Sequence, residues 1–184
     1  MSVTKRLIEQ PAVISFGANL GDRRATLLAA ARELADADGV ELTAISPVIE
    51  TPALRPDGVD HAAPAYLNAV ALVTTSLTPE ALLDLLTRIE HAHGRIRAER
   101  WGDRTLDLDL IDFAGMVSST DQLTLPHPRA FERDFVLKPW LAVDPDAVLP
   151  GHGRVADLVA GLASAPDGTH DGTHDGTHDG GAAS

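Results

Sequence analysis

The chain contains no cysteine, which excludes disulfide bonds and thiolate metal sites. Basic residues are also scarce: Lys and Arg number 15 against 27 Asp and Glu, and the formal net charge is −12. Such a charge disfavours nonspecific attraction to nucleic acid or anionic lipid. No apolar run reaches the roughly 18 residues that a membrane-spanning helix needs, and the opening residues lack the apolar segment of a signal peptide. These absences favour a cytoplasmic enzyme or binding protein with no nucleic-acid or membrane partner.

The composition predicts one compact domain followed by a tail. A length of 184 residues, 44% of them hydrophobic, suits a single core of ordinary size, which we place in residues 1–165. Residues 167–178 repeat Asp-Gly-Thr-His three times and offer no apolar group to bury, so residues 166–184 are expected to be disordered. The histidines of this repeat could bind a metal loosely, but flexible spacing imposes no geometry, and a solvated tail is the simpler interpretation.

The order of predicted elements indicates the fold class. A buried strand over 12–16 leads through a glycine turn to a helix that Asp22 caps, with an apolar stripe at Leu27, Leu28, Ala31, Leu34 and Ala35. Strands follow at 40–44 and 66–75, with a loop over 52–64 between them. A second helix starts at Thr78-Pro79 and ends at Gly94, and a strand covers 106–113. This order is that of the α+β ferredoxin-like βαββαβ fold, an antiparallel sheet with helices on one face, elaborated by elements after residue 115.

The last of these strands carries two aspartates. Successive residues of a strand alternate between faces, so Asp107 and Asp109 share one face while Leu106, Leu108 and Leu110 face the core. Two carboxylates this close repel each other unless a cation lies between them, and hard oxygen ligands suit Mg²⁺. The pair therefore predicts a magnesium site; the alternative is an acidic strand face in solvent.

Arginines crowd the residues directly before this pair. Four of the chain's 13 arginines fall at 95, 97, 100 and 104. The planar guanidinium matches phosphate oxygens, and Mg²⁺ neutralises the same anion, which is the recurring arrangement for phosphoryl transfer. The alternative is that these arginines only pair with Glu90, Glu99 and Asp103. No Walker-type or GxGxxG motif occurs, so side chains and loop backbone would have to hold a nucleotide.

Two further groups complete the candidate site. The segment LPHPRAFERDFVLKPW brings together His127, Arg129, Arg133 and Phe135, which offer cations, an imidazole and an aromatic wall. Tyr66 and Asn68 share a strand face, so an aromatic ring and an amide point the same way. An amide beside aromatic rings suits a planar, nitrogen-rich heterocycle.

Five segments together resemble the 6-hydroxymethyl-7,8-dihydropterin pyrophosphokinases of folate biosynthesis: FGANLGDR, ETPAL, YLNAV, RIEHAHGRIRAERWGDRTLDLDLIDF and LPHPRAFERDFVLKPW. The resemblance covers about residues 12–152 and is most specific in RWGDRTLDLDL with the downstream PHPR. It implies a ferredoxin-like fold, two Mg²⁺ ions, and transfer of pyrophosphate from ATP to the pterin hydroxymethyl oxygen with release of AMP. A monomer that takes only these small-molecule partners is expected.

The resemblance also implies roles for individual residues. Asp107 and Asp109 would bind metal, and Arg95 and Arg104 would act with them on the transferring phosphates. The residues expected to contact ATP are Glu90, Arg95, Arg97, Leu110, Thr124, His127 and Arg133. The pterin would be bound by Thr51, Pro52, Leu54, Tyr66, Asn68, Trp101 and Phe135.

The chain departs from a common pattern of that family at Ala18, often a serine, at Thr87 and Gln122, where Gln and Arg are expected near ATP, and in the long loop 55–65.

Two other functions fit the element order. A two-metal nucleotidyltransferase on a ferredoxin-like fold also binds metals through strand aspartates, but it releases pyrophosphate instead of AMP. An RNA-binding module of the same topology would need paired aromatics on its strands, which are missing here.

Overall fold

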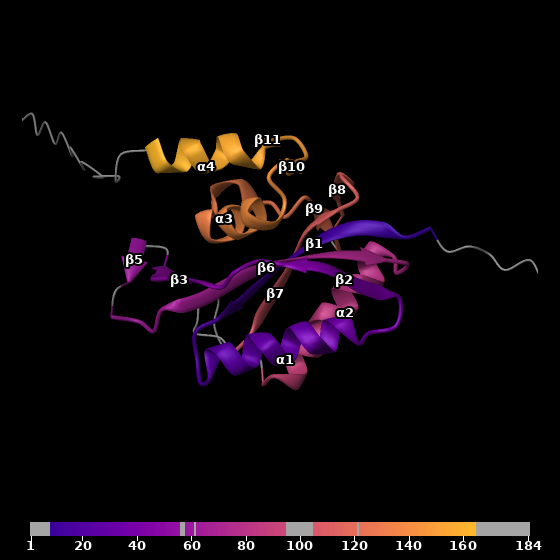
Figure 1. Cartoon of the computed structure of the whole chain (residues 1–184), viewed down its shortest axis with the longest axis horizontal. Helices are drawn as coiled ribbons and strands as arrows, with labels where there is room; N and C mark the ends of the chain where they lie inside the picture. The colour runs from indigo at the N-terminus through magenta and orange to yellow at the C-terminus, as the bar shows by residue number, and fades with distance from the viewer. Residues whose placement is uncertain (1–7, 56–57, 61, 95–104, 121, 165–184) are drawn as a thin grey trace, which may run out of the picture.

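The computed structural model describes residues 8–55, 58–60, 62–94, 105–120 and 122–164. Its central sheet has the strand order β2 (Val40–Ile45), β6 (Tyr66–Thr75), β1 (Gln10–Ala18) and β7 (Asp107–Phe113), with every neighbouring pair antiparallel. A short strand β3 (Ile49–Thr51) pairs with β6 on the same edge as β2. With α1 (Arg23–Ala35) after β1 and α2 (Pro79–Ala92) before β7, this is the predicted ferredoxin-like βαββαβ arrangement (Figure 1).

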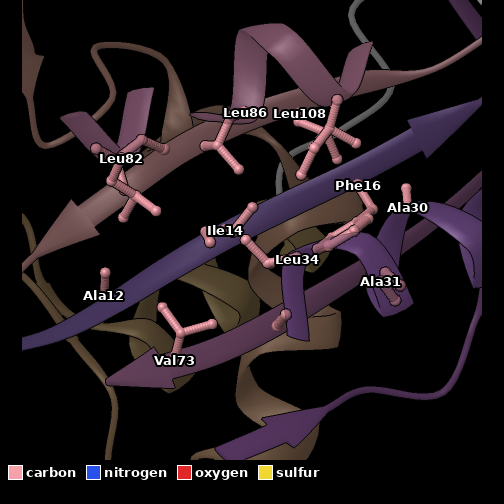
Figure 2. Close-up of a cluster of buried hydrophobic side chains, with 14 of the residues drawn as sticks. Ala12, Ile14, Phe16, Ala30, Ala31, Leu34, Val73, Leu82, Leu86 and Leu108 are labelled. Atoms are coloured by element: carbon pink, nitrogen blue, oxygen red, sulfur yellow. The ribbon is translucent and has the colours of Figure 1, made fainter. Parts of the chain in front are cut away.

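One face of the sheet packs against α1 and α2 and forms the larger hydrophobic core. Ile14 and Phe16 of β1 meet Leu34 of α1 and Leu82 and Leu86 of α2, and all five are at most 1% exposed (Figure 2). Both helices begin as predicted, because the Asp22 side chain accepts a hydrogen bond from Ala25 N and the Thr78 side chain accepts one from Ala81 N.

The stripe predicted for α1 is partly wrong. Leu28 is 52% exposed and Ala35 is also exposed, whereas Ala30 is fully buried. The helix buries Leu27, Ala30, Ala31 and Leu34, which occupy positions i, i+3, i+4 and i+7 of one helix face. Leu28 lies about 100° around the helix from Leu27, which turns it toward solvent.

The opposite face of the sheet is covered by the elements that follow residue 115, as Figure 1 shows. These include η1 (Ala130–Glu132), α3 (Asp134–Val143), the pair β10 (Val148–Leu149) and β11 (Gly153–Arg154), and α4 (Val155–Ser164). Val13, Val70 and Ile111 of the sheet form a second core with Leu137 and Trp140 of α3. The two-stranded β8 (Ser118–Ser119) and β9 (Thr124–Leu125) lies between β7 and η1 in the chain.

The segment predicted as a loop over 52–64 contains a hairpin that the sequence did not indicate. Its strands are β4 (Ala53–Arg55) and β5 (Gly58–Asp60).

Within the described ranges no helix has both the length and the apolar character needed to cross a bilayer. The predicted tail lies outside the described residues, so the assignment of residues 1–165 to one domain stays a prediction.

Asp112 is a half-buried carboxylate at an irregularity of β7. The register between β1 and β7 shifts after Val13, and Asp112 faces that residue. Its Oδ2 accepts a hydrogen bond from Gly115 N, while its Oδ1 is buried with no partner among the described residues. Burial raises the pKa of Asp112, and hydrogen bonds from the backbone of Gly115 and Phe113 oppose the rise.

Replacing Asp112 by Asn should therefore raise the melting temperature at pH 7. A carboxyl whose pKa is raised in the folded state stabilises the protein below its unfolded pKa and loses that contribution as the pH rises through the folded pKa. The gain from Asp112→Asn should shrink as the pH is lowered toward 3, where the carboxyl is protonated in both states. Thermal unfolding at several pH values measures this, with Asp84→Asn, an exposed residue of α2, as the control. A gain that grew on acidification would contradict the assignment.

Candidate active site

The register of β1 brings predicted site residues from two different strands together. Gly17 of β1 pairs with Asn68 of β6 on one side and with Asp107 of β7 on the other. Ser15 pairs in the same way with Val70 and Asp109. Paired residues of antiparallel strands project from the same face. Asp107 and Asp109 therefore share a face, as predicted. Leu106, Leu108 and Leu110 lie on the other face, in the larger core beside α1 and α2, which we call the helix-side core.

These residues form two cross-strand rows beside the second core. The row of Val70, Ser15 and Asp109 borders that core, because Val70 is fully buried in it whereas the Asp109 side chain is 31% exposed. The row of Asn68, Gly17 and Asp107 lies two residues farther from Val13 along β1. We call these two rows the site floor.

A cation and an imidazole converge on Asp109 from the segment before α3. Arg133 Nη1 lies 3.2 Å from Asp109 Oδ2 in a hydrogen-bonded ion pair. His127 Nε2 lies 3.9 Å from the same oxygen. The backbone fixes His127 there, because its N–H donates to the Ile111 carbonyl at 2.8 Å beside the register shift of β7. His127 and Arg133, which the sequence analysis grouped together, thus both lie beside Asp109.

The pKa of His127 is lowered from its ordinary value, which favours the neutral imidazole. Burial lowers its pKa, the carboxylates of Asp109 and Asp107 raise it, and Arg133 lowers it further. Its Nδ1 accepts a hydrogen bond from Arg129 N at 3.2 Å. The neutral ring therefore carries its proton on Nε2, the nitrogen that faces Asp109. That N–H is available to donate to an anionic oxygen at the site floor.

The aspartates fit a magnesium ion that arrives with a phosphate. Among the described residues no group of three or more His, Asp or Glu side chains could hold a metal ion alone. Mg²⁺ commonly uses one or two protein carboxylates and takes its remaining ligands from substrate phosphates and water. Two strand carboxylates on one face could supply the oxygen ligands and the opposite charge for such a complex.

A second group of predicted residues surrounds Asn68, which is 3% exposed. The Asn68 amide nitrogen donates to Thr51 Oγ1 at 2.8 Å, and Thr51 pairs with Tyr66 across β3 and β6. A Cβ at Gly17 would lie 3.4 Å from Asn68 Oδ1, 3.8 Å from the Tyr66 ring and 3.9 Å from Asp107 Cβ. Gly17 is thus the point where the amide, the aromatic ring and the acidic pair meet.

The remaining predicted residues lie on other described segments or outside the described part of the chain. Phe135 is half-buried, with the Arg133 guanidinium carbon 5.6 Å from its ring centroid. Thr124 and Pro52 are exposed, and the backbone of Leu54 lies in β4. The predicted residues outside the described ranges are Arg95, Arg97, Trp101 and Arg104.

The side chains of Glu90 and Leu110 are deeply buried, which disfavours a direct contact with ATP. Both side chains are buried, Glu90 at 2% exposure and Leu110 at 5%, and Leu110 packs in the helix-side core. Glu90 Oε1 accepts the Leu108 N–H at 2.7 Å, so it ties α2 to β7 between the two aspartates. Any contact from Leu110 to a nucleotide must come from its backbone. Their assignment to ATP binding stays a prediction.

Comparison with known proteins identifies the family. The profile of 7,8-dihydro-6-hydroxymethylpterin-pyrophosphokinase (HPPK) matches residues 13–145. The chain belongs to the HPPK family. It is 36% identical over 152 residues to the 2-amino-4-hydroxy-6-hydroxymethyldihydropteridine pyrophosphokinase of Haemophilus influenzae, covering 83% of this chain and 92% of the relative. The protein of the same name from Methylorubrum extorquens is 39% identical over 140 residues, with coverages of 76% and 86%.

Solved structures agree with the HPPK assignment at the level of the fold. The crystal structure of wild-type Plasmodium falciparum HPPK-DHPS with pterin and p-hydroxybenzoate superposes with a TM-score of 0.64 at 15% sequence identity. The match covers 88% of this chain and 43% of that one. The chain therefore corresponds to less than half of the Plasmodium protein, and the likeness concerns the fold alone.

Sequence reasoning missed residues whose importance depends on neighbouring strands. Gly17 gave no signal of its own, because only the pairing of β1 with both β6 and β7 sets it between Asn68 and Asp107. Arg23 was also missed, although it is one of two arginines that open α1, where a helix favours acidic residues. Asn19 is 2% exposed. Like Gly17 and Arg23, it entered the sequence analysis only as part of the motif FGANLGDR, without a role of its own.

Gly17→Ala should fold normally but bind pterin poorly. The residue has no positive φ, and the new methyl would meet its neighbours at ordinary contact distances, so backbone strain and clashes are small. The methyl would nevertheless occupy space among Asn68, Tyr66 and Asp107 that a flat ligand needs. We expect a pterin dissociation constant on the order of tenfold higher by calorimetry, since a misfit of one methyl group costs about 1–3 kcal/mol.

Gly161→Ala in α4 is the matched control, because a Cβ there meets nothing within 4 Å. It should leave pterin binding unchanged and raise the melting temperature slightly, as Ala favours helix over Gly. If Gly17→Ala bound pterin with wild-type affinity, the prediction that the pterin lies against Gly17 would be wrong.

Proposed function

We propose that this HPPK family member transfers pyrophosphate from ATP to 6-hydroxymethyl-7,8-dihydropterin in the cytoplasm, producing AMP and the pterin diphosphate for folate biosynthesis. One observation carries the proposal at the level of this chain. The Asp107–Asp109 pair adjoins Asn68 and Tyr66 across a single glycine, Gly17. A site for a metal-bound phosphate and a site for a heterocycle thus share one floor.

The acidic side of the floor would bind the ATP phosphates. Asp107 and Asp109 would hold Mg²⁺, of which two ions are proposed, and when bound these ions would supply the positive charge that neutralises the phosphates. Arg133 and His127 already lie beside Asp109, where they would also contact phosphate oxygens. Further proposed ATP contacts come from Glu90, Arg95, Arg97, Thr124 and the backbone of Leu110, and Arg95 and Arg104 would stabilise charge on the transferring group.

The amide side of the floor would bind the pterin. The Asn68 nitrogen is fixed by Thr51, which leaves its carbonyl oxygen directed toward the Gly17 side, where it can accept hydrogen bonds from a heterocycle's N–H groups. Tyr66 and Phe135 would stack on the ring. Pro52, Leu54 and Trp101 complete the proposed set.

The chemistry needs positioning and charge neutralisation more than a reactive side chain. The pterin hydroxymethyl oxygen would attack the β-phosphorus of ATP in line with the departing AMP and release its proton to solvent, so no covalent enzyme intermediate forms. Arg133 and the Nε2–H of His127 can stabilise phosphate charge without taking a proton. A single monomer contains every described residue used in this scheme.

Identifying the nucleotide product tests the proposal against its main rival. The purified protein is incubated with ATP, Mg²⁺ and 6-hydroxymethyl-7,8-dihydropterin, and products are separated by ion-exchange chromatography. AMP in equal amount to pterin diphosphate supports pyrophosphoryl transfer. Release of free pyrophosphate with a pterin-linked AMP would instead indicate a nucleotidyltransferase, and ADP a simple kinase.

Asp107→Ala and Asp109→Ala should each fold but lose about a thousandfold or more in turnover. Their side chains lie on the face opposite the helix-side core, whereas metal-mediated charge stabilisation is worth several kcal/mol and each ~1.4 kcal/mol is tenfold in rate. Circular dichroism checks folding, and the AMP assay measures turnover. Asp84→Ala, an exposed aspartate of α2, is the control. A folded single variant with near wild-type turnover would return the pair to an acidic strand face.

A further inference from the structure

Arg23 links strand β3 to the residue directly before strand β6. Its Nη1 donates to the Ala65 carbonyl at 2.6 Å and to Glu50 Oε1 at 2.8 Å. Glu50 belongs to β3, and Ala65 directly precedes β6. One guanidinium therefore holds the two strands of the β3–β6 pair at the same end.

That end of the pair carries the proposed pterin residues. Thr51 follows Glu50, Tyr66 follows Ala65, and Thr51 and Tyr66 are paired across the two strands. Asn19 adds a second link from the segment before α1 to the segment before β6, since its amide nitrogen donates to the Pro64 carbonyl at 3.3 Å. The backbone before Tyr66 and the side chain before Thr51 are thus both bonded to the segment that opens α1.

The position of Arg23 is unfavourable for the helix it begins. A helix N-terminus carries a partial positive charge, which favours acidic side chains in the first turn. The first turn of α1 has no acidic residue and starts with Arg23 and Arg24. Residues that break a local rule in this way commonly serve a function that offsets the cost. Arg24 is exposed and makes none of these cross-loop contacts, whereas the Arg23 side chain is only 31% exposed.

We propose that Arg23 is a positioning residue for the acceptor site: it fixes the strand ends that present Thr51 and Tyr66 to the pterin, without touching the reacting atoms. This inference rests on the proposed function. The hydrogen bond to the Ala65 carbonyl is the main contact, because it is charge-assisted and partly buried, whereas Glu50 is 57% exposed and the ion pair is weakened by solvent.

Arg23→Ala should separate pterin binding from stability and from ATP binding. Alanine removes the unfavourable charge and is the best helix former, so the melting temperature should stay within a few degrees of wild type. The KM for 6-hydroxymethyl-7,8-dihydropterin should rise on the order of tenfold, as expected for a lost hydrogen bond to a charged group. The KM for ATP and the turnover at saturating pterin should change less than about twofold.

Two matched variants isolate the contact. Arg24→Ala makes the same change to the helix terminus one residue later and should keep the wild-type KM for pterin. Glu50→Ala keeps the Ala65 hydrogen bond and should have an effect smaller than about threefold. Direct calorimetry with 6-hydroxymethylpterin checks that the KM changes report affinity.

The outcomes distinguish the positioning role from the function itself. A selective rise in the pterin KM for Arg23→Ala, absent in Arg24→Ala, supports the proposal. A wild-type pterin KM in Arg23→Ala, or an equal rise for pterin and ATP, overturns it while leaving pyrophosphoryl transfer standing. A wild-type protein that formed AMP with no dependence on pterin would overturn the proposed function, and the role of Arg23 with it.

Discussion

The antiparallel pairing of β1 with β6 on one side and β7 on the other is the constraint on which the site depends. Side chains alternate faces along a strand, so a slip of one residue in either pair would turn Asp107 and Asp109, or Tyr66 and Asn68, into the helix-side core. Ile14 and Phe16 prevent such a slip, because they are buried between α1 and α2 on the other face. The same apolar residues that stabilise the fold thus set the register that assembles the site.

The second layer of helices supplies what the sheet alone lacks. Val13, Val70 and Ile111 bury one region of the face that carries the aspartates, and η1 and α3 bring Arg133 to its border. The register shift in β7 has a consequence on each side: Asp112 becomes half-buried with a raised pKa, and the Ile111 carbonyl accepts the hydrogen bond that places His127. Glu90 acts from the first layer, since its buried carboxylate binds the β7 backbone between Asp107 and Asp109.

Local chemistry in the sequence predicted a large part of this structure. The strand over 66–75 and the caps at Asp22 and Thr78 follow from alternation and from hydrogen bonds within a few residues. The shared face of Asp107 and Asp109 is equally local. The β4–β5 hairpin was missed because the segment lacks an alternating apolar pattern, and Leu28 was misplaced because an alanine, not the larger leucine, faces the core.

Features that depend on distant neighbours were beyond the sequence. Gly17 lies between Asn68 and Asp107 only because β6 and β7 flank β1. Arg23 can bond to both Glu50 and Ala65 only because these residues meet at one end of the β3–β6 pair. The resemblance suggested Leu110 as an ATP contact, whereas strand alternation predicted its side chain in the core, and the structure places it there. For Gly17 and Arg23 chain topology, not local propensity, decides what the residue contacts.

The central claim is that one floor on the α3 side of the sheet holds both substrates, with Gly17 between them. A crystal structure with Mg²⁺, a non-hydrolysable ATP analogue and 6-hydroxymethylpterin tests it most directly. The account predicts metal bound by Asp107 and Asp109, Arg133 moved from Asp109 to a phosphate, and the pterin ring against Tyr66 and Asn68. Phosphates bound away from the two aspartates, or a pterin ring elsewhere than beside Gly17, would contradict it.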